Sequence, residues 1–278
     1  MKIDFLKMHG LGNDFILVDT LRHPSINELS LSELSALSQR LCRRRFGVGA
    51  DQLLLLCPSE VASFRMRIFN ADGSEVQMCG NGIRCLARYI WDSGLSDTSP
   101  LEIETMAGII RPERAGELVR VNMGVPLFNP EDIPVKSDRP DNIEIRIDSK
   151  VFRLNCVSMG NPHAVIIADD LEGIELSRFG PLIENHPLFP ERTNVEFVQV
   201  LNPQEIRMRV WERGVGETLA CGTGASASAV VCIKQGMADQ RVTVHLLGGD
   251  LVIEWDGDGP VYMTGPAVAV FEGTIDIS

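Results

Sequence analysis

The sequence predicts an α/β protein made of two related modules, each with strands wrapped around one central buried helix. Three observations support this fold class. Strand-like runs dominate the chain, two helical segments are apolar over most or all of their surface, and one glycine-rich motif recurs about half a chain length later. The 278 residues suffice for one large domain or two of ordinary size.

Many segments combine alternating or continuous apolar patterns with β-branched and aromatic residues, which is typical of strands. The predicted strands are 3–8, 14–20, 51–57, 64–70, 101–106, 117–123, 143–148, 151–155, 163–168, 195–200, 206–211, 242–247, 251–255, 261–265 and 267–271.

Three segments have helical periodicity. A surface helix is predicted over 30–45, where Ser30 and Glu33 form a capping box and arginines crowd the C-terminal end. The segments 83–94 and 225–236 each follow a Cys-Gly-x-Gly turn and end at a glycine. Their apolar and small residues predict buried helices.

An internal repeat and a proline-rich connection indicate two modules. A shift of 142 residues carries Cys79 onto Cys221, since 221 − 79 = 142, and the same shift aligns further positions. These pairs are Glu75 with Glu217, Gly80 with Gly222, Gly82 with Gly224, Asn70 with Glu212, and Gln52 with Asn194; Asn13 aligns with Asn161 at a shift of 148. Because proline and charge cluster at 126–141, we expect modules over 1–122, with Cys79, and 123–265, with Cys221.

Composition excludes several classes of partner. A formal net charge of −12 argues against nucleic acid and anionic membrane surfaces. The longest apolar runs, 53–57 and 228–233, are too short to span a bilayer, and the N-terminus does not resemble a signal peptide. Seven cysteines without metal-ligand spacing predict reduced thiols in the cytoplasm and no metal site.

Each repeated motif places one cysteine before Gly-x-Gly at the start of a buried helix. Helix N-terminal amides carry partial positive charge, and glycines let a ligand approach them closely. The motif therefore predicts a seat for a carboxylate. The same field is expected to lower the pKa of the thiol towards neutrality. We interpret the remaining cysteines as packed core residues.

Two such sites facing one molecule would suit a specific reaction. A hydrolase needs one nucleophile and its base, and a redox pair needs a disulfide. A thiolate and a thiol on opposite faces of a carbon can instead remove one proton and deliver another, which inverts the stereocentre. The two sulfurs then share one proton and titrate as a pair.

The sequence resembles the diaminopimelate epimerase family essentially from end to end. The resemblance rests on KMHGLGNDFILVD, FGVGADQLLLL, FNADGSEVQMCGNGIRC, SMGNPHAVI, HPLFPERTNVEFV, VWERGVGETLACGTGASA and GPAVAVFEG. Proline racemase relatives with the same fold carry histidine where this chain has Asn81, which argues against that family. One departure is Phe271, where family members often have tyrosine at the dimer contact.

The resemblance implies a fold and an activity. The fold is a pair of pseudo-symmetric domains, each a mostly antiparallel sheet around a central helix, with the site in the cleft between them. The implied activity is the interconversion of LL- and meso-2,6-diaminopimelate. It needs no pyridoxal phosphate, no other cofactor and no metal. The reaction belongs to lysine and peptidoglycan-precursor biosynthesis. A cytoplasmic homodimer is expected, and segment 266–278 is expected to return as a strand to the first module and the dimer interface.

The resemblance also assigns residues. Cys79 and Cys221 correspond to the acid/base pair, with His163 and Glu212 near the reacting centre. The substrate-binding positions are Asn13, Gln52, Asn70, Gly80, Asn81, Asn161, Asn194, Glu212, Arg213, Gly222 and Thr223. Amides and Glu212 can receive ammonium groups, and Arg213 can hold the distal carboxylate with two hydrogen bonds.

Alternatives remain at this point. The chain could be a proline racemase-like enzyme, or a single-cysteine thiol hydrolase or amidotransferase that uses one cysteine with His163. It could also be a module that binds a small molecule without catalysis. His163 itself has either a direct catalytic role or a structural one.

Overall fold

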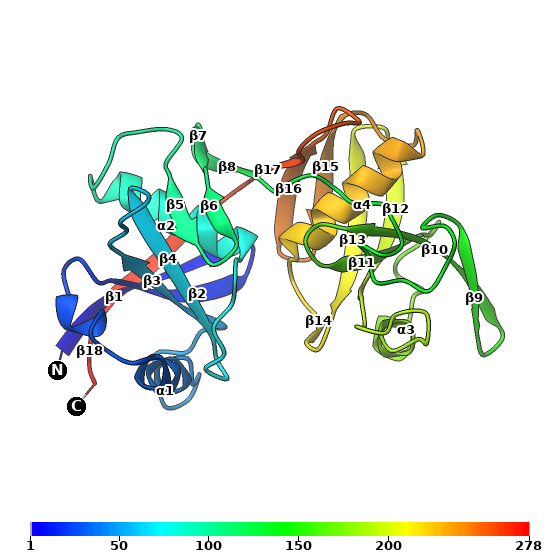
Figure 1. Cartoon of the computed structure of the whole chain (residues 1–278). Coiled ribbons are helices and arrows are strands. Elements are labelled where there is room, and N and C mark those ends of the chain that lie inside the picture. The colour runs from blue at the N-terminus through cyan, green and yellow to red at the C-terminus, as the bar shows by residue number, and fades with distance from the viewer. Residues whose placement is uncertain (1, 278) are drawn as a thin grey trace. The chain divides into compact units, whose positions relative to one another are not determined.

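A computed structural model describes residues 2–277, which form two compact units (Figure 1). The first unit runs to Val121 and includes the segment from Gly265 onward, and the second unit is Asn122–Thr264. Each unit is a mixed sheet with one helix of thirteen residues packed across it. The predicted α/β fold of two sheet-rich, pseudo-symmetric modules is therefore confirmed.

The first unit contains a seven-stranded sheet in which most neighbouring strands are antiparallel. Its order is β18 (Val268–Asp276), β1 (Lys2–Gly10), β2 (Asn13–Asp19), β3 (Gln52–Cys57), β4 (Phe64–Asn70), β5 (Ile103–Thr105) and β6 (Gly108–Ile110). The pairs β2–β3 and β4–β5 are parallel. A short hairpin, β7 (Glu113–Ala115) with β8 (Leu118–Asn122), follows.

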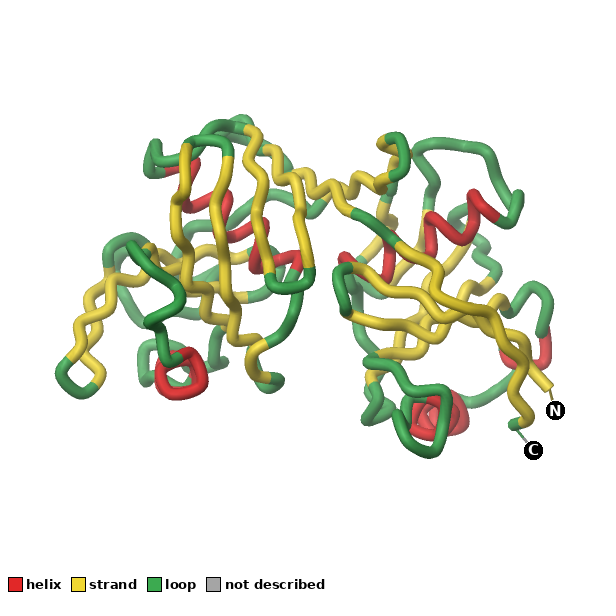
Figure 2. Tube along the Cα trace, turned by 180° about the vertical axis from the view of Figure 1, so that it is seen from behind, coloured by secondary structure: helices red, strands yellow, loops and turns green. Residues whose placement is uncertain are grey.

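Helices cover both faces of this sheet because its strands are apolar on both sides. Helix α1 (Leu31–Leu41) packs Leu34 and Leu37 against Ile16 and Val18. Helix α2 (Gly80–Asp92) contacts β1 to β4 from the other face. The α2 helix is the red segment that crosses behind the strands of its unit in Figure 2.

The second unit repeats this arrangement. Its strands lie in the order β17 (Tyr262–Gly265), β16 (Gly249–Glu254), β15 (Arg241–Leu246), β13 (Glu205–Glu212), β12 (Asn194–Asn202), β11 (Pro162–Ile167), β10 (Lys150–Ser158) and β9 (Ile143–Ile147); β14 (Gly216–Glu217) pairs with β13. Helix α4 (Gly222–Lys234) contacts β10 to β13, and α3 (Leu176–Glu184) packs on the opposite side through Phe179 and Ile183.

Equivalent strands have equivalent register. In the first unit, β2 runs parallel to β3 and Phe15 lies opposite Gln52. In the second unit, β11 runs parallel to β12 and His163 lies opposite Asn194. The structural repeat therefore matches the repeat seen in the sequence, with Gln52 equivalent to Asn194.

Every predicted strand segment overlaps an observed strand, but several elements differ from the prediction. The first helix ends at Leu41 rather than at Arg45 because the chain turns back on it, and a Cβ on Gly47 would lie 2.4 Å from the Arg40 carbonyl oxygen. Helices α2 and α4 begin earlier than expected, at the glycines themselves. Helix α3 was not predicted, and it contains Pro181, a residue that is unfavourable inside a helix.

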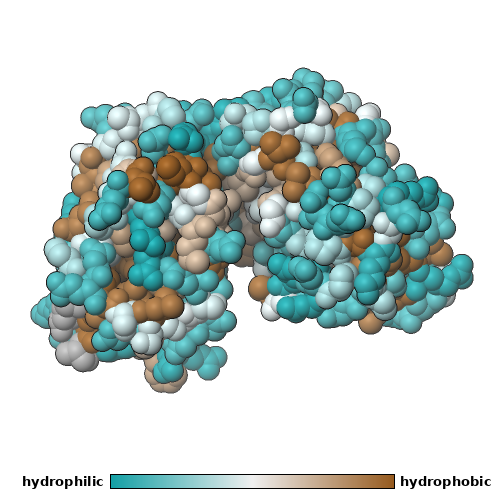
Figure 3. Space-filling view, viewed as in Figure 1, coloured by the Kyte–Doolittle hydropathy of each residue, from teal (hydrophilic) through white to brown (hydrophobic). Residues whose placement is uncertain are grey.

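Hydrophilic side chains cover most of the visible face of each unit, with apolar patches between them (Figure 3). Among residues 2–277, none of the helices is long and apolar enough to cross a membrane.

The start of α1 offers a test of local folding. The Ser30 hydroxyl accepts a hydrogen bond from the Glu33 amide, and the Glu33 carboxylate accepts one from the Ser30 amide. Ser30→Ala should lower the free energy of unfolding by about 1 kcal/mol because the cap is lost. Urea unfolding measures it, with Ser32→Ala as the control in the same helical turn. A Ser30→Ala midpoint equal to that of the control would contradict the capping role.

Candidate active site

Cys79 is the N-cap of α2, and its backbone is extended with φ −141° and ψ 119°. Its half-buried thiol lies 3.7 Å from the Oδ1 atom of Asn13, the first residue of β2. The Asn81 side chain donates to the same Oδ1 atom at 3.2 Å. Asn13 thus connects the cysteine with the first turn of the helix.

The first turn of α2 presents backbone donors beside this sulfur. The first helical hydrogen bond runs from the Ile83 amide to the Cys79 carbonyl at 2.9 Å. The amides of Gly80 and Asn81 precede it and have no carbonyl one turn back. A Cβ on Gly82 would lie 3.2 Å from Ile68 and 3.4 Å from Phe15, so glycine lets the turn pack closely on the sheet. The geometry suits a carboxylate.

Polar side chains at the ends of β3 and β4 continue the first module's part of the candidate site. The Gln52 amide donates to Asn70 Oδ1 at 2.8 Å, and Asn70 donates to the Ser74 hydroxyl at 2.9 Å. Within residues 2–277, Gln52 Oε1 is buried and accepts no hydrogen bond. An acceptor in this state is suited to an N–H donor such as an ammonium group.

A charged network holds the start of β2 in place. Asp14 accepts hydrogen bonds from Lys7 at 2.6 Å and from Arg44 at 2.8 and 2.9 Å, and Asn13 donates to Asp51 at 3.1 Å. Burial raises the pKa of Asp14, but the bonds from Arg44, Lys7 and the Asp51 amide outweigh it and hold the pKa well below 3.8. The carboxylate is therefore ionised at neutral pH.

Cys221 is the N-cap of α4 and has a similar extended backbone, with φ −123° and ψ 111°, but here the side chain also makes a capping hydrogen bond. The Gly224 amide donates to its sulfur at 3.4 Å, and the Thr223 hydroxyl lies 3.5 Å from it. A Cβ on Gly224 would lie 2.8 Å from a carboxylate oxygen of Glu196. Glycine at this position therefore lets Glu196 approach the helix N-terminus.

Two carboxylates surround Cys221. Burial, followed by the negative charges of Glu212 and Glu196, raises the pKa of the Cys221 thiol well above 9.0. The predicted lowering of the thiol pKa by the helix N-terminus is therefore wrong for Cys221. Burial also raises the pKa of Glu212, while hydrogen bonds with Thr218 and Cys221 lower it. Glu212 and Cys221 are therefore neighbours in the second module.

His163 lies behind this group and is fully buried. Its Nδ1 atom is 2.7 Å from Glu196 Oε1, and its Nε2 atom is 3.0 Å from Asn161 Oδ1. The Asn161 amide donates to the Thr223 hydroxyl at 3.4 Å. The histidine therefore connects to the first turn of α4 through Asn161.

The sequence analysis did not identify Glu196. It is the single acidic residue in the apolar run Val195–Val198 and is fully buried in β12. A charged residue within a buried apolar strand is rarely left without a partner. That signal could have identified the position, but only the structure shows that its partner is His163.

Asn194 and Arg213 meet at the ends of β12 and β13. Asn194 donates to the Pro162 carbonyl at 2.8 Å and accepts a hydrogen bond from the Arg213 amide at 3.0 Å. The Arg213 guanidinium donates to the Glu191 carbonyl at 3.1 Å. The positive charge of Arg213 is thus held just after the end of β13, next to Asn194 at the start of β12.

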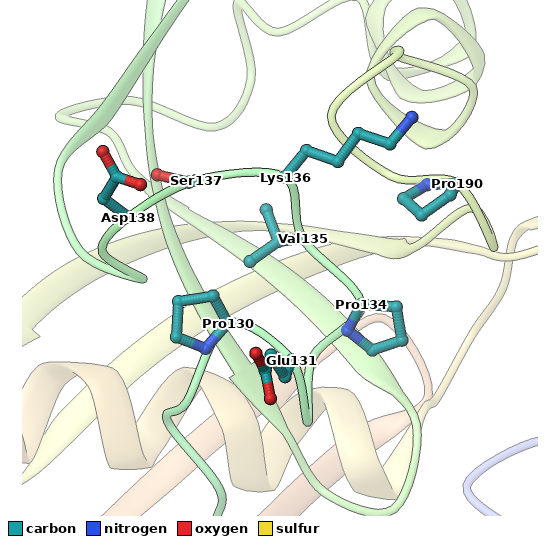
Figure 4. Close-up of a pocket in the computed structure, with 8 residues that line it drawn as sticks. All are labelled: Pro130, Glu131, Pro134, Val135, Lys136, Ser137, Asp138 and Pro190. Carbon is teal, nitrogen blue, oxygen red and sulfur yellow. The ribbon is translucent and has the colours of Figure 1, made fainter.

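Each unit brings its own share of the predicted residues together. The first unit holds Asn13, Gln52, Asn70, Cys79, Gly80 and Asn81, and the second holds Asn161, His163, Asn194, Glu212, Arg213, Cys221, Gly222 and Thr223. A separate surface pocket lies in the second unit, formed by segment 130–138 and Pro190 (Figure 4). None of the predicted residues lines it. Among residues 2–277, no group of three or more His, Cys, Asp or Glu side chains could hold a metal ion.

The two modules each carry one cysteine at the N-terminus of a central helix. Sequence comparison places the chain among the isomerases of the racemase and epimerase class. Residues 5–128 and 155–270 match the sequence model of the family described as diaminopimelate epimerase. The chain therefore belongs to the diaminopimelate epimerase family.

Similar proteins carry the same name. The diaminopimelate epimerase of Moorella thermoacetica is 53% identical over 277 residues, covering 97% of this chain and 98% of that protein. The diaminopimelate epimerase of Chromobacterium violaceum is 50% identical over 282 residues, with complete coverage of both chains.

Solved structures of lower identity show the fold. A PhzF-family phenazine biosynthesis protein from Bacillus anthracis superimposes with a TM-score of 0.73 at 17% identity, covering 100% of both chains. A hydroxyproline epimerase from Agrobacterium vitis has a TM-score of 0.72 at 15% identity and covers 99% of this chain and 93% of its own.

The Asp14 network predicts how stability depends on pH. Because folding lowers the pKa of Asp14, its contribution is present above about pH 3.8 and is lost as pH falls further. Asp14→Asn should cost about 2 kcal/mol at pH 7 and should flatten the loss of stability in acid. Urea unfolding at several pH values measures this, with the exposed Asp97→Asn as control. An unchanged acid slope in Asp14→Asn would contradict the assignment.

Proposed function

We propose that this chain interconverts LL- and meso-2,6-diaminopimelate by two-base proton transfer at one α-carbon, without a cofactor. The observation that carries the proposal is the repeated N-cap: Cys79 and Cys221 occupy the same position at the start of equivalent helices. Membership of the diaminopimelate epimerase family supports diaminopimelate as the substrate. This reaction supplies a precursor of lysine and of peptidoglycan.

Proton transfer uses both sulfurs. One cysteine, as thiolate, accepts the α-proton and becomes a thiol. The other, as thiol, donates its proton to the opposite face of the same carbon and becomes a thiolate. Proton and charge balance, and the stereocentre is inverted. This mechanism requires both sulfurs to reach one α-carbon.

Backbone amides would stabilise the charge that develops on the substrate carboxylate. Donors fixed before the reaction need no rearrangement as charge builds up, which makes them effective. The amides of Gly80 and Asn81 in α2, and those of Gly222 and Thr223 in α4, have this geometry. We assign them to the α-carboxylate.

The remaining polar residues would recognise the two amino-acid ends. Gln52 Oε1 and the Asn70 amide suit an ammonium group, and Glu212 adds a carboxylate acceptor. Arg213 would hold the distal carboxylate with two hydrogen bonds. The three asparagines would position their neighbours. Asn13 contacts Asn81 at the start of α2, Asn161 contacts Thr223 at the start of α4, and Asn194 accepts a hydrogen bond from the Arg213 amide.

Glu212 and His163 have different roles in this proposal. Glu212 would accept a hydrogen bond from the Cys221 thiol and keep it in position. Both ring nitrogens of His163 are engaged, by Glu196 and by Asn161. His163 is therefore a positioning residue in this proposal. The same engagement weighs against a thiol hydrolase in which His163 activates one cysteine.

We extend the proposal to a cytoplasmic homodimer. A reducing compartment suits an enzyme that needs two thiols. Strand β18 is the edge of its sheet and exposes Val268, Val270 and Phe271 by 43%, 56% and 48%. Exposed apolar edge strands are suited to pairing with a second chain.

Isotope exchange tests the reaction. Incubating LL-diaminopimelate with the enzyme in D₂O, without added cofactor, should give meso product with one solvent deuterium at the inverted α-carbon, followed by NMR and mass spectrometry. Cys79→Ala and Cys221→Ala should each lower net turnover by at least about a thousandfold because one of the two proton donors is gone. Full turnover by either variant would remove that cysteine from the mechanism.

Sedimentation tests the dimer. Phe271→Asp should weaken self-association because a charge would be buried without a partner at the contact. Analytical ultracentrifugation over a concentration series gives the dissociation constant, and Val61→Asp, at a position 66% exposed outside the edge strand, is the matched control. A monomeric wild-type chain at all concentrations would refute the dimer.

A further inference from the structure

The two cysteine sites share one backbone frame but differ in charge. Arg84 and Ser226 are equivalent, since 226 − 84 = 142, and both are fully buried in the second turn of their helix. Arg84 Nη1 donates to the Gly80 carbonyl at 3.2 Å, and the Ser226 hydroxyl donates to the equivalent Gly222 carbonyl at 2.9 Å. One frame therefore holds a cation where the other holds a neutral hydroxyl.

Arg84 is connected to the cysteine end of α2. Its Nη2 atom donates to Asn81 Oδ1 at 2.9 Å, and Asn81 shares the Asn13 oxygen with Cys79. Its Nε atom donates to the Pro266 carbonyl at 3.1 Å, which ties the helix to the returning C-terminal segment. Burial lowers the pKa of Arg84, while negative charge at Cys85 and Cys79 would raise it. An arginine stays charged even when buried.

The second module has the opposite charge pattern. Counting back 142 residues, Glu212 corresponds to Asn70 and Glu196 corresponds to Leu54. Glu196 faces α4, as the contact with Gly224 shows, and within residues 2–277 its Oε2 atom is buried without a hydrogen bond. The His163 ring is paired with Glu196 through its Nδ1 atom. Two carboxylates, Glu212 and Glu196, therefore act on Cys221, and the histidine beside them is already bound to one of them.

We propose that, before substrate binds, Cys79 is the thiolate and Cys221 holds the proton, and that Arg84 is the positioning residue that sets this order. A nearby cation favours the charged form of a thiol, and nearby carboxylates disfavour it. The inference rests on the proposed two-thiol reaction and adds the order in which the sulfurs ionise. It gives Arg84 a role that Ser226 cannot perform in α4.

The other titratable groups linked to the two sulfurs are already paired or neutral. On the Cys79 side, Cys85 is the neighbouring thiol, and Asn13 connects Cys79 to Asp51, which is paired with Arg44. Burial raises the pKa of Cys85 to about 12, so this neighbouring thiol stays neutral. Near Cys221, Arg209 is paired with Glu217, and the Arg213 guanidinium donates to a backbone carbonyl.

The order in which the two sulfurs ionise has a consequence for turnover. Conversion of one isomer begins with the α-proton moving to Cys79 and ends with the charge on Cys221. Cys221 then holds a thiolate beside Glu212 and Glu196, which is the less favourable arrangement. Return of the proton to Cys221 restores the first state. The reverse reaction starts from that less favourable form.

Alkylation without substrate tests the order in the wild-type enzyme. Only thiolates react readily with iodoacetamide, so the pH midpoint of the labelling rate reports each ionisation independently of differences in access. Tandem mass spectrometry of peptides assigns the label to each cysteine. We expect the Cys79 midpoint to lie at least about one pH unit below that of Cys221. Equal midpoints, or a lower one for Cys221, would overturn the proposal.

Variants test the role of Arg84. Arg84→Met should lower the labelling rate of Cys79 at pH 7 by about tenfold or more and should leave the Cys221 midpoint unchanged. Arg84→Lys keeps a cation and should keep most of the Cys79 shift, which a purely structural role would not predict. Ser226→Ala is the matched control in α4 and should not move the Cys79 midpoint. An unmoved midpoint in Arg84→Met would refute the role of Arg84.

A second arm tests the carboxylates. Glu196→Gln should lower the Cys221 midpoint and leave that of Cys79 in place, and a fixed Cys221 midpoint would contradict the charge argument for this module. All midpoints are measured without diaminopimelate. A failed epimerisation assay with the expected midpoints would therefore remove the proposed function alone, and active enzyme with reversed midpoints would remove only this inference.

Discussion

The position of each reactive sulfur depends on one constraint, the capping of a buried helix by cysteine. An N-cap residue has an extended backbone, and its side chain lies beside the free amides of the next turn. Cys79 and Cys221 both satisfy this geometry. Because α2 and α4 are packed on their sheets, the sulfurs and amides are fixed by the fold rather than by mobile loops.

The repeated frame explains how one motif can serve two chemical roles. Backbone geometry is similar in both modules, so each has the first-turn amides of a helix next to a thiol. The charged side chains near the two frames differ. In the first module Arg84 of α2 hydrogen-bonds to the first turn of its own helix, and in the second module Glu196 of β12 and Glu212 of β13 act on Cys221. A two-base epimerase needs such a difference because one sulfur must give a proton while the other takes one.

Periodicity and motif spacing predicted the sheets, the buried helices and the repeat. The cysteines were found because their motif occurs twice at one offset. Glu196 was missed because sequence alone does not show that a strand residue faces a helix N-terminus. The expected fall in the Cys221 pKa was wrong for the same reason: burial and the carboxylates of β12 and β13 outweigh the helix terminus. Helix α3 was not predicted. It contains Pro181, and its buried Phe179 and Ile183 pack in the hydrophobic core, a tertiary contact that the local sequence does not show.

A crystal structure with bound 2-methyl-2,6-diaminopimelate tests the central claim most directly. The methyl group replaces the α-hydrogen, so the ligand can bind but cannot lose a proton. We expect Cys79 and Cys221 to lie on opposite faces of the substituted carbon, with its carboxylate on the amides of α2 and α4. A complex in which only one sulfur approaches that carbon would contradict the two-base mechanism.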